Sequence, residues 1–309
     1  MGHYDVIQFY LALVSAAKAR GIRCAITSGM ACVAYEVAEA TKDCDLLCDP
    51  EAAADFLALL AESPFEGAAC RYRGNISPPL DARWHKGGWT SHFEWPGSEA
   101  YLDVFGIAPR ARSSWLEEMQ PPYVHPHVVA DMKRTGRDKD WPFISALGVK
   151  MVEKGDERGW LHVYELDSLR RLMAEKPAPP AALLEARPLL KLVATGSPLI
   201  GAAARLERSF WQELSDLRVR LFEKLLRSYV VAMRKATAGT GRELGLHENH
   251  KLRVECAEQH LPPRPLTPDV LAEFIAKAKE SVLTGMTPEM GVWLPDVNPN
   301  FTLLIPELK

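Results

Sequence analysis

Hydrophobic residues in the first 63 positions switch between a helical and a strand-like pattern. From 5 to 20, apolar side chains recur every three or four residues, and Gly21 ends the stretch. Two short apolar runs, at 22–27 and 44–49, predict buried strands, and each is followed by a helical pattern, at 30–39 and 50–63. Helices and strands in alternation predict an α/β (α+β) domain.

The pattern changes twice more along the chain. Stretches at 67–74, 81–86, 88–95 and 99–106 predict strands, with Gly87-Gly88 as a tight hairpin turn. Helical periodicity returns over 125–153, is broken at 134–142, and dominates the rest of the chain up to an extended tail at 295–309. We predict an α/β domain with a mixed sheet at 1–155 and a mainly α-helical domain at 156–309, with a candidate linker, EKPAPPA, at 175–181.

Composition narrows the class of protein without naming a function. Of 309 residues, 47% are hydrophobic and 25% charged, as in ordinary soluble globular proteins, and the net charge of −3 gives no overall attraction to nucleic acid. No apolar run approaches the length of a membrane span, and the N-terminus lacks the basic region of a signal peptide. Six scattered cysteines predict reduced thiols and a cytoplasmic location.

Three aspartates interrupt otherwise apolar strand patterns. In ATKDCDL, Asp43 and Asp45 share one strand face, while Cys44, Leu46 and Cys48 share the other, which predicts core thiols and rules against a mixed Cys/Asp site. Asp103 is embedded in AYLDVFG in the same way. Like charges this close require a metal ion, a bound cationic group or solvent. An all-oxygen ligand set is the preference of Mg²⁺ or Mn²⁺.

A small-residue turn precedes the acids. Ser28-Gly29 in AITSGMA lies between a predicted strand and a predicted helix, where backbone N–H groups and a helix N-terminus suit a phosphate. The turn, the Asp-x-Asp pair after thirteen intervening residues, and the later strand acid together resemble the nucleotidyltransferase superfamily, which has a polymerase-β-like fold. TKDCDL is similar to the T-x-D-h-D-h core of its minimal, AbiEii-like toxin-type members. The resemblance covers about residues 22–150.

The resemblance implies roles for particular residues. Asp43 and Asp45 would hold the catalytic metals, and Asp103 would complete the set and help to activate the attacking hydroxyl. Ser28 and Gly29 would contact the triphosphate.

A later segment extends the resemblance. VVADMKRTGRDKDWPFI is similar to a helix and turn common in these proteins, which implies that Lys133 contacts the β- and γ-phosphates. Arg137, Lys139 and Asp140 fill the turn, and Asp140 is available to pair with one of the bases.

Two functions remain open at this point. The first is metal-dependent transfer of a nucleoside monophosphate from an NTP, ATP among them, to a hydroxyl of tRNA, protein or a small molecule, releasing pyrophosphate. The acceptor is expected between the sheet and the helical domain. The second is a non-catalytic nucleotide-binding or partner-docking protein on the same fold. It is favoured by the Ser-Gly order of the turn, and by Glu39, which stands where many relatives carry arginine.

Two further patterns have plainer interpretations. Trp89, Phe93 and Trp95 share one predicted strand face and are either a stacking platform or half of a sheet core, and we favour the core. Basic residues lie nearby in the sequence and leave an RNA-facing surface as an alternative interpretation: Arg71, Arg73, Arg83 and Lys86. A His/Cys series suggests zinc only superficially, and we interpret it as packing or surface residues: His247, His250, Cys256 and His260.

Overall fold

The structure is a computed structural model that describes residues 3–39, 41, 43–111, 114–238, 244–286, 288–295 and 297. Its first part confirms the predicted alternation of helices and strands. The elements are α1 (His3–Ala19), β1 (Cys24–Thr27), α2 (Ser28–Ala34), β2 (Cys44–Cys48), a 3-10 turn η1 (Pro50–Ala52) and α3 (Ala53–Ala61).

The strands form one seven-stranded mixed sheet, as predicted for the fold class. The remaining strands are β3 (Arg71–Tyr72), β4 (Thr90–Glu94), β5 (Tyr101–Phe105), β6 (Met119–Gln120) and β7 (Tyr123–Val124). Their order is β3-β4-β5-β2-β1-β7-β6. The β2–β5 and β1–β7 pairs are parallel, and the other pairs are antiparallel. The centre of the sheet is therefore β5-β2-β1, and these strands carry Asp103 and Asp45 and lead into the Ser28-Gly29 segment.

The prediction of a strand at 81–86 was wrong, because this stretch is a short helix, α4 (Ala82–His85). The Asp81 side chain accepts a hydrogen bond from the Arg83 backbone N–H and so caps the helix start. Gly87-Gly88 then joins a helix to β4 and does not form a hairpin. A Cβ on Gly87 would lie 1.7 Å from the Pro263 carbonyl oxygen, so this position accommodates a close backbone approach from a distant segment.

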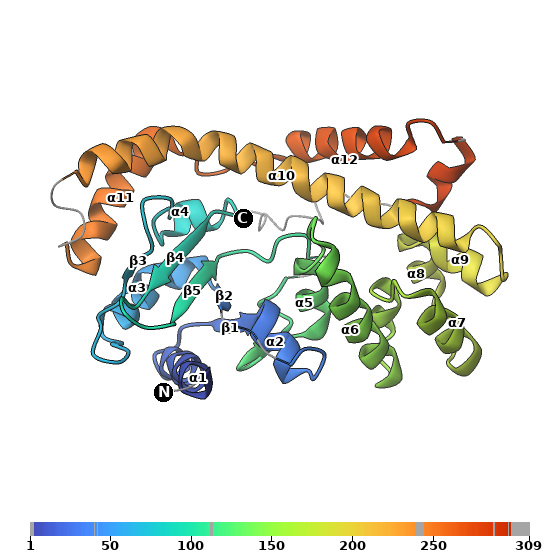
Figure 1. Cartoon of the computed structure of the whole chain (residues 1–309), viewed down its shortest axis with the longest axis horizontal. Coiled ribbons are helices and arrows are strands. Elements are labelled where there is room, and N and C mark those ends of the chain that lie inside the picture. The colour runs from blue at the N-terminus through green and yellow to red at the C-terminus, as the bar shows by residue number, and fades with distance from the viewer. Residues whose placement is uncertain are drawn as a thin grey trace.

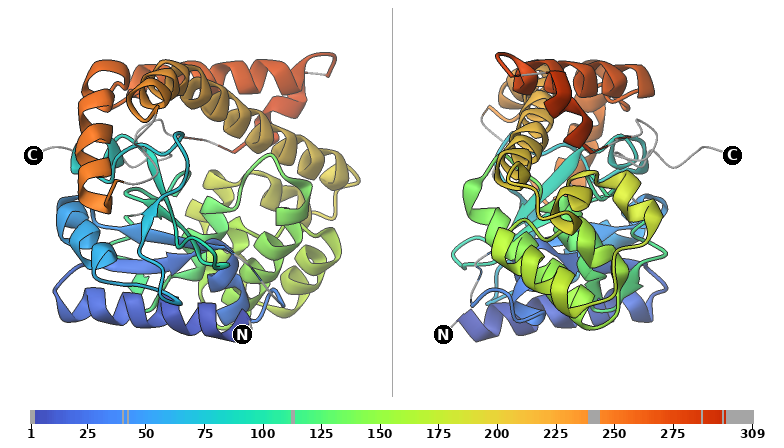
Figure 2. Two further views of the ribbon diagram at one scale, coloured as in Figure 1. Left: turned by 60° about the vertical axis from the view of Figure 1, so that its left-hand side comes forward. Right: turned by 90° about the vertical axis from the view of Figure 1, so that its right-hand side faces the viewer.

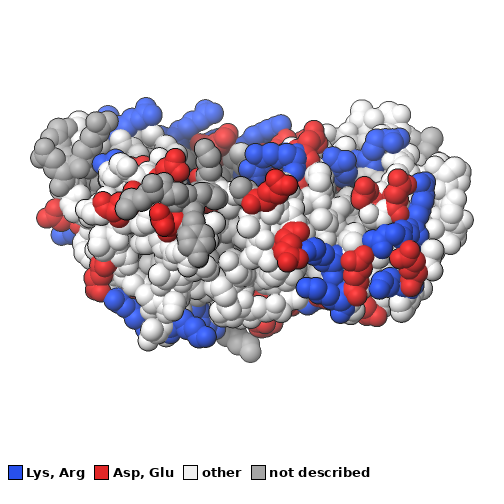
Figure 3. All heavy atoms as spheres, turned by 60° about the horizontal axis from the view of Figure 1, so that its bottom comes forward, with Lys and Arg blue, Asp and Glu red and all other residues white. Residues whose placement is uncertain are grey.

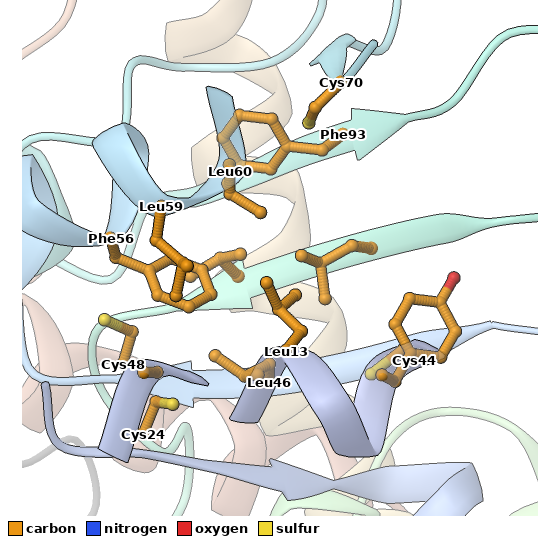
Figure 4. Packing of buried hydrophobic residues seen from close by; sticks show 14 of the residues in the cluster. Leu13, Cys24, Cys44, Leu46, Cys48, Phe56, Leu59, Leu60, Cys70 and Phe93 are labelled. Atoms are coloured by element: carbon orange, nitrogen blue, oxygen red, sulfur yellow. The ribbon is translucent and has the colours of Figure 1, made fainter. Parts of the chain in front are cut away.

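One face of the sheet packs against α1 and α3. Leu13 from α1 and Phe56 and Leu60 from α3 belong to one buried cluster with strand residues of this face, among them Leu46 of β2 and Phe93 of β4 (Figure 4). Cys44, Leu46 and Cys48 all belong to this buried cluster, which confirms their predicted assignment to the core. All six cysteines are free thiols.

The opposite face packs against helices from both halves of the chain. The sheet shares a buried cluster with α5 (Pro126–Met132), α6 (Trp141–Glu153) and α10 (Ile200–Ala236), and η2 (Asp138–Asp140) lies between α5 and α6. A separate buried cluster joins α6 and α10 to η3 (Glu157–Leu161), α7 (Leu166–Glu175), α8 (Ala181–Ala186) and α9 (Leu189–Ala194). Helix α10 extends along the length of the molecule (Figure 1). A single buried cluster contains Ala25 and Leu47 from the sheet and Leu206 and Phe210 from α10. The two predicted domains therefore share part of their core.

One of the last elements of the chain, a helix that follows α10, packs next to the edge of the sheet. After α10 come α11 (Leu246–His260), α12 (Pro268–Leu283) and η4 (Pro288–Trp293). Helix α11 folds back from α10 toward α3 and β3 (Figure 2). The candidate linker lies between α7 and α8, whose Leu172 and Leu183 pack in one cluster. Of the predicted tail, all residues except 295 and 297 lie outside the described part of the chain.

On the face seen in Figure 3, the described surface carries both basic and acidic side chains, and neither charge covers it. Charged side chains of both signs are mixed at the right-hand end, where Figure 1 shows α6 to α9. Exposed ion pairs such as Arg171–Glu153, at 3.0 Å, occur in this region. Among the described residues, no helix combines the length and the apolar character needed to cross a membrane.

Candidate active site

A row of polar side chains crosses four neighbouring strands on the face opposite α1 and α3. Thr27 on β1 lies opposite Asp45 on β2, Asp45 lies opposite Asp103 on β5, and Asp103 lies opposite His92 on β4. Residues directly opposite each other on paired strands point to the same face. The register alone therefore brings two of the three predicted acids side by side, on strands roughly 4.8 Å apart.

Asp45 is at the centre of this row, and its pKa is raised to about 6. Burial is the largest cause, because it disfavours the charged carboxylate, and the nearby charge of Asp103 adds to it. The Ser28 hydroxyl, which hydrogen-bonds to the Asp45 carboxylate, and the positive charge of Lys133 act in the opposite direction. The charge of Asp43 also raises the pKa of Asp45, so five of the six predicted site residues lie within electrostatic reach of one another: Ser28, Asp43, Asp45, Asp103 and Lys133.

Asp103 is held by two residues that sequence reasoning did not assign to the site. Arg73 Nη2 and His92 Nδ1 each lie 2.7 Å from Asp103 Oδ1. Arg73 directly follows β3, and its backbone N–H donates to the His92 carbonyl at 2.9 Å, which extends the β3–β4 pairing by one residue. The orientation of the Asp103 carboxylate is therefore fixed from the β3–β4 side.

Lys133 ends α5 and is buried. Its Nζ donates to Asp140 Oδ1 at 3.3 Å, and Asp140 Oδ2 accepts from the Thr135 hydroxyl at 2.8 Å and from Arg137 Nε at 2.8 Å. Although burial acts to raise it, the cations and the hydroxyl hold the pKa of Asp140 below its usual value. The expectation that Asp140 pairs with a base of this turn is confirmed. Asp140 also anchors the lysine ammonium next to Asp45.

The Ser28-Gly29 turn is tightly packed. Ser28 has a φ of +51°, in the left-handed region that non-glycine residues seldom adopt. A Cβ on Gly29 would lie 2.4 Å from Thr41 Oγ1 and 3.0 Å from Thr41 Cβ. Glycine at 29 therefore lets the segment before β2 close over the turn. Ser28 and Gly29 are the first two residues of α2, which has only seven residues.

This contact predicts the effect of a single methyl group at position 29. We expect Gly29→Ala to lower the free energy of unfolding by about 1–3 kcal/mol, because the Thr41 side chain must be displaced. Urea unfolding followed by circular dichroism measures the change. Gly245→Ala is the matched control, since its added Cβ meets nothing within 4 Å. Equal unfolding midpoints for Gly29→Ala and Gly245→Ala would contradict the proposed packing.

Asp43 has a different environment from the other two acids. It is exposed, lies just before β2, and its carbonyl accepts a 3.5 Å hydrogen bond from Thr41 Oγ1. Within the described residues, no three His, Cys, Asp or Glu side chains are grouped so that they could hold a metal ion. Asp45 and Asp103 therefore form a pair. A pair fits the chemistry of Mg²⁺, which proteins usually bind through one or two carboxylates together with water and substrate phosphates.

The aromatic pattern singled out in the sequence is a packing feature, and the His/Cys series contains both partly buried residues and the exposed His247. Phe93 and Trp95 are buried in the cluster beneath the sheet, and Trp89 is buried against α10 and α11, which confirms the interpretation as core. The Trp89 indole donates to the Pro262 carbonyl at 2.9 Å. His250 pairs with the Tyr72 hydroxyl at 2.7 Å.

Comparison of the chain with protein-family models, with curated proteins and with solved structures gave no match. The fold and the site define the class of this protein: it is an α/β protein with a mixed sheet and a carboxylate pair on its central strands.

Proposed function

We propose that this protein transfers a nucleoside monophosphate from an NTP, such as ATP, to a hydroxyl group of an acceptor. In this reaction the acceptor oxygen forms a bond to the α-phosphorus. The bond from the α-phosphorus to the bridging oxygen breaks, and pyrophosphate leaves with that electron pair. The observation that carries the proposal is the direct pairing of Asp45 with Asp103, with the Ser28 hydroxyl and Lys133 beside Asp45.

The carboxylate pair supplies the acid ligands that this chemistry needs. Asp45 and Asp103 would hold Mg²⁺ or Mn²⁺, which neutralises charge on the reacting phosphates when bound. Asp43 remains the predicted third ligand, from its exposed position two residues before Asp45. Asp103, oriented by Arg73 and His92, would accept the proton of the acceptor hydroxyl.

The residues on the other side of Asp45 suit the triphosphate. Ser28 and Gly29 would contact its oxygens from the turn after β1. Lys133 would bind the β- and γ-phosphates. Its 3.3 Å contact with Asp140 is long for a charge-assisted hydrogen bond, so a phosphate oxygen can compete for the ammonium. The chain thereby supports the NTP on the β1–α5 side of the acids and leaves the β3–β4 side for the acceptor.

A second candidate function is a non-catalytic nucleotide-binding or partner-docking protein. The observation in its favour is that Arg73 already forms an ion pair with Asp103, and that His92 contacts the same carboxylate oxygen, without a metal. In that case the nucleotide would bind and remain unchanged.

Label transfer distinguishes the two functions. The protein is incubated with each α-³²P-labelled NTP and Mg²⁺, or with EDTA, in the presence of separate pools of RNA, protein and small molecules. We expect Mg²⁺-dependent labelling of one pool by wild type, and its loss in Asp43→Ala. Asp55→Asn, which changes an exposed aspartate on α3, is the control and should retain transfer.

Each other result has a defined meaning. Mg²⁺-dependent NTP binding without labelling of any pool supports the non-catalytic function. Absence of both binding and labelling refutes nucleotidyl transfer. Full activity of Asp43→Ala would remove Asp43 from the set of metal ligands and leave the Asp45–Asp103 pair.

A further inference from the structure

A cavity of about 660 Å³ lies next to the candidate active site, at the edge of the sheet. Its walls come from β3 and the loop after it, from β4, from the last turn of α10, and from α11. Among the described residues, the charged side chains that line it are three arginines and one glutamate: Arg71, Arg234, Arg253 and Glu94. Counting these side chains gives a net charge of +2 for the cavity wall. The charge contrasts with the net −3 of the whole chain.

Arg253 is the buried cation of this cavity, with 1% of its surface exposed. Its nitrogens donate to Asn249 Oδ1 and to the carbonyls of Ser77 and Gly74, each at 2.6 Å, and its guanidinium stacks on the Tyr72 ring. None of these acceptors is charged, and no carboxylate among the described residues forms an ion pair with Arg253. A buried charge is expensive to keep without a counter-charge. The wall is therefore suited to an anion.

The other two arginines lie at the mouth of the cavity. Arg234 is exposed, and no described residue forms an ion pair with it. Arg71 donates to Glu94 Oε1 at 2.8 Å, and 45% of its side chain is exposed. Arginine is the side chain best suited to bidentate recognition of phosphate oxygens.

The cavity adjoins the acids on the side away from Ser28 and Lys133. Arg73, which contacts Asp103, belongs to the same segment as the lining residues Arg71 and Gly74. Glu94 lies two residues beyond His92 on β4 and so faces the same side of the sheet. Arg73 thus connects the segment that lines the cavity with the carboxylate of Asp103.

We propose that this cavity binds a phosphate-bearing ligand and presents its hydroxyl to Asp103, as the acceptor site of the reaction. The assignment as an acceptor site rests on the proposed function. Binding of phosphate in the cavity does not, because it depends only on Arg71, Arg234 and Arg253. The phosphate belongs either to a nucleic-acid strand or to a small phosphorylated metabolite.

Fluorescence anisotropy of a labelled six-nucleotide RNA tests the proposal on the full-length protein, in EDTA and without NTP. We expect Arg234→Glu to weaken binding about tenfold, because one charge-assisted contact is lost and repulsion is added. Lys235→Glu makes the same charge change at the next residue, which is exposed and does not line the cavity, and should change affinity less than about twofold. Circular dichroism verifies that both variants are folded.

Competition with unlabelled glucose 6-phosphate and ATP identifies the source of the phosphate. Displacement by glucose 6-phosphate indicates a small phosphorylated acceptor, and displacement by neither compound indicates a nucleic-acid strand. Displacement by ATP would assign the cavity to the nucleotide and overturn its role as the acceptor site. Absence of RNA and glucose 6-phosphate binding, or equal losses in Arg234→Glu and Lys235→Glu, would overturn the proposal entirely. Since turnover is not measured, failure of label transfer alone leaves the binding result standing.

Discussion

Replacing Asp45 with asparagine will stabilise the metal-free protein above pH 6. The pKa of Asp45 is about 6 in the folded state, above its usual value of 3.8, so the folded state binds this proton more tightly than the unfolded state. Stability is therefore lost as the pH rises between about 4 and 6, and the full cost remains above pH 6. From the size of the shift this cost is up to about 3 kcal/mol, which Asp45→Asn removes.

Under the proposed function, the same substitution will abolish nucleotidyl transfer. An amide cannot supply the negative charge that the reacting phosphates and their metal ion require, so we expect the transfer rate to fall at least about 100-fold. Urea unfolding in EDTA at pH 4 and pH 8 measures stability, and transfer of α-³²P label measures activity. The stability gain should be present at pH 8 and absent at pH 4.

Mg²⁺ provides the internal control for this prediction. Adding Mg²⁺ at pH 8 should stabilise the wild type, because the ion relieves repulsion between Asp45 and Asp103, and should have little effect on Asp45→Asn. If Asp45→Asn is less stable than wild type at pH 8 in EDTA, the carboxylate contributes favourably to the fold, and the site would be a structural ion-pair network.

The central strands could be predicted from the sequence because each is marked by a hydrophobic pattern within its own few residues. The apolar runs around Ile26 and Leu46 are short and bounded by turns, and they became β1 and β2. The stretch at 81–86 was predicted as a strand, together with its neighbours, because the helical period is absent from this part of the sequence. It forms α4 because Trp84 packs against Tyr229 and Leu261, which come from far along the chain. Tertiary packing of this kind leaves no local signal.

The residues of the candidate site could be predicted only where their spacing along the sequence identified them. The Asp-x-Asp pair, the strand acid and the turn identified Asp45, Asp103 and Ser28, which the fold brings together. Arg73 and His92 were missed because their contact with Asp103 depends on the register of three strands. The alternation of TSHFE does assign His92 to the face opposite Phe93. It cannot specify which residue of β5 lies beside it.

The buried pair Arg187–Glu207 is where we expect the largest loss of stability. Both side chains are fully buried, and Arg187 Nε lies 3.1 and 3.0 Å from the two Glu207 oxygens. Arg187 also donates to the carbonyls of Trp160 and Val163, so the pair ties α10 to the segment after α6. Glu207→Ala leaves the Arg187 charge buried and unpaired, which we expect to cost about 3–5 kcal/mol. Urea unfolding measures it.

A double substitution separates the ion pair from its desolvation cost. Because Arg187→Met with Glu207→Leu removes both charges and keeps apolar volume, we expect it to recover most of the stability that Glu207→Ala loses. Glu62→Ala, which breaks the exposed Arg20–Glu62 pair, should leave the unfolding midpoint almost unchanged. If the double variant is as unstable as Glu207→Ala, the loss arises from the hydrogen bonds that Glu207 accepts from the Tyr164 hydroxyl and the Trp211 indole. If it recovers, α10 is joined to the helices before it mainly by apolar contacts, and the charged pair acts to fix their relative position.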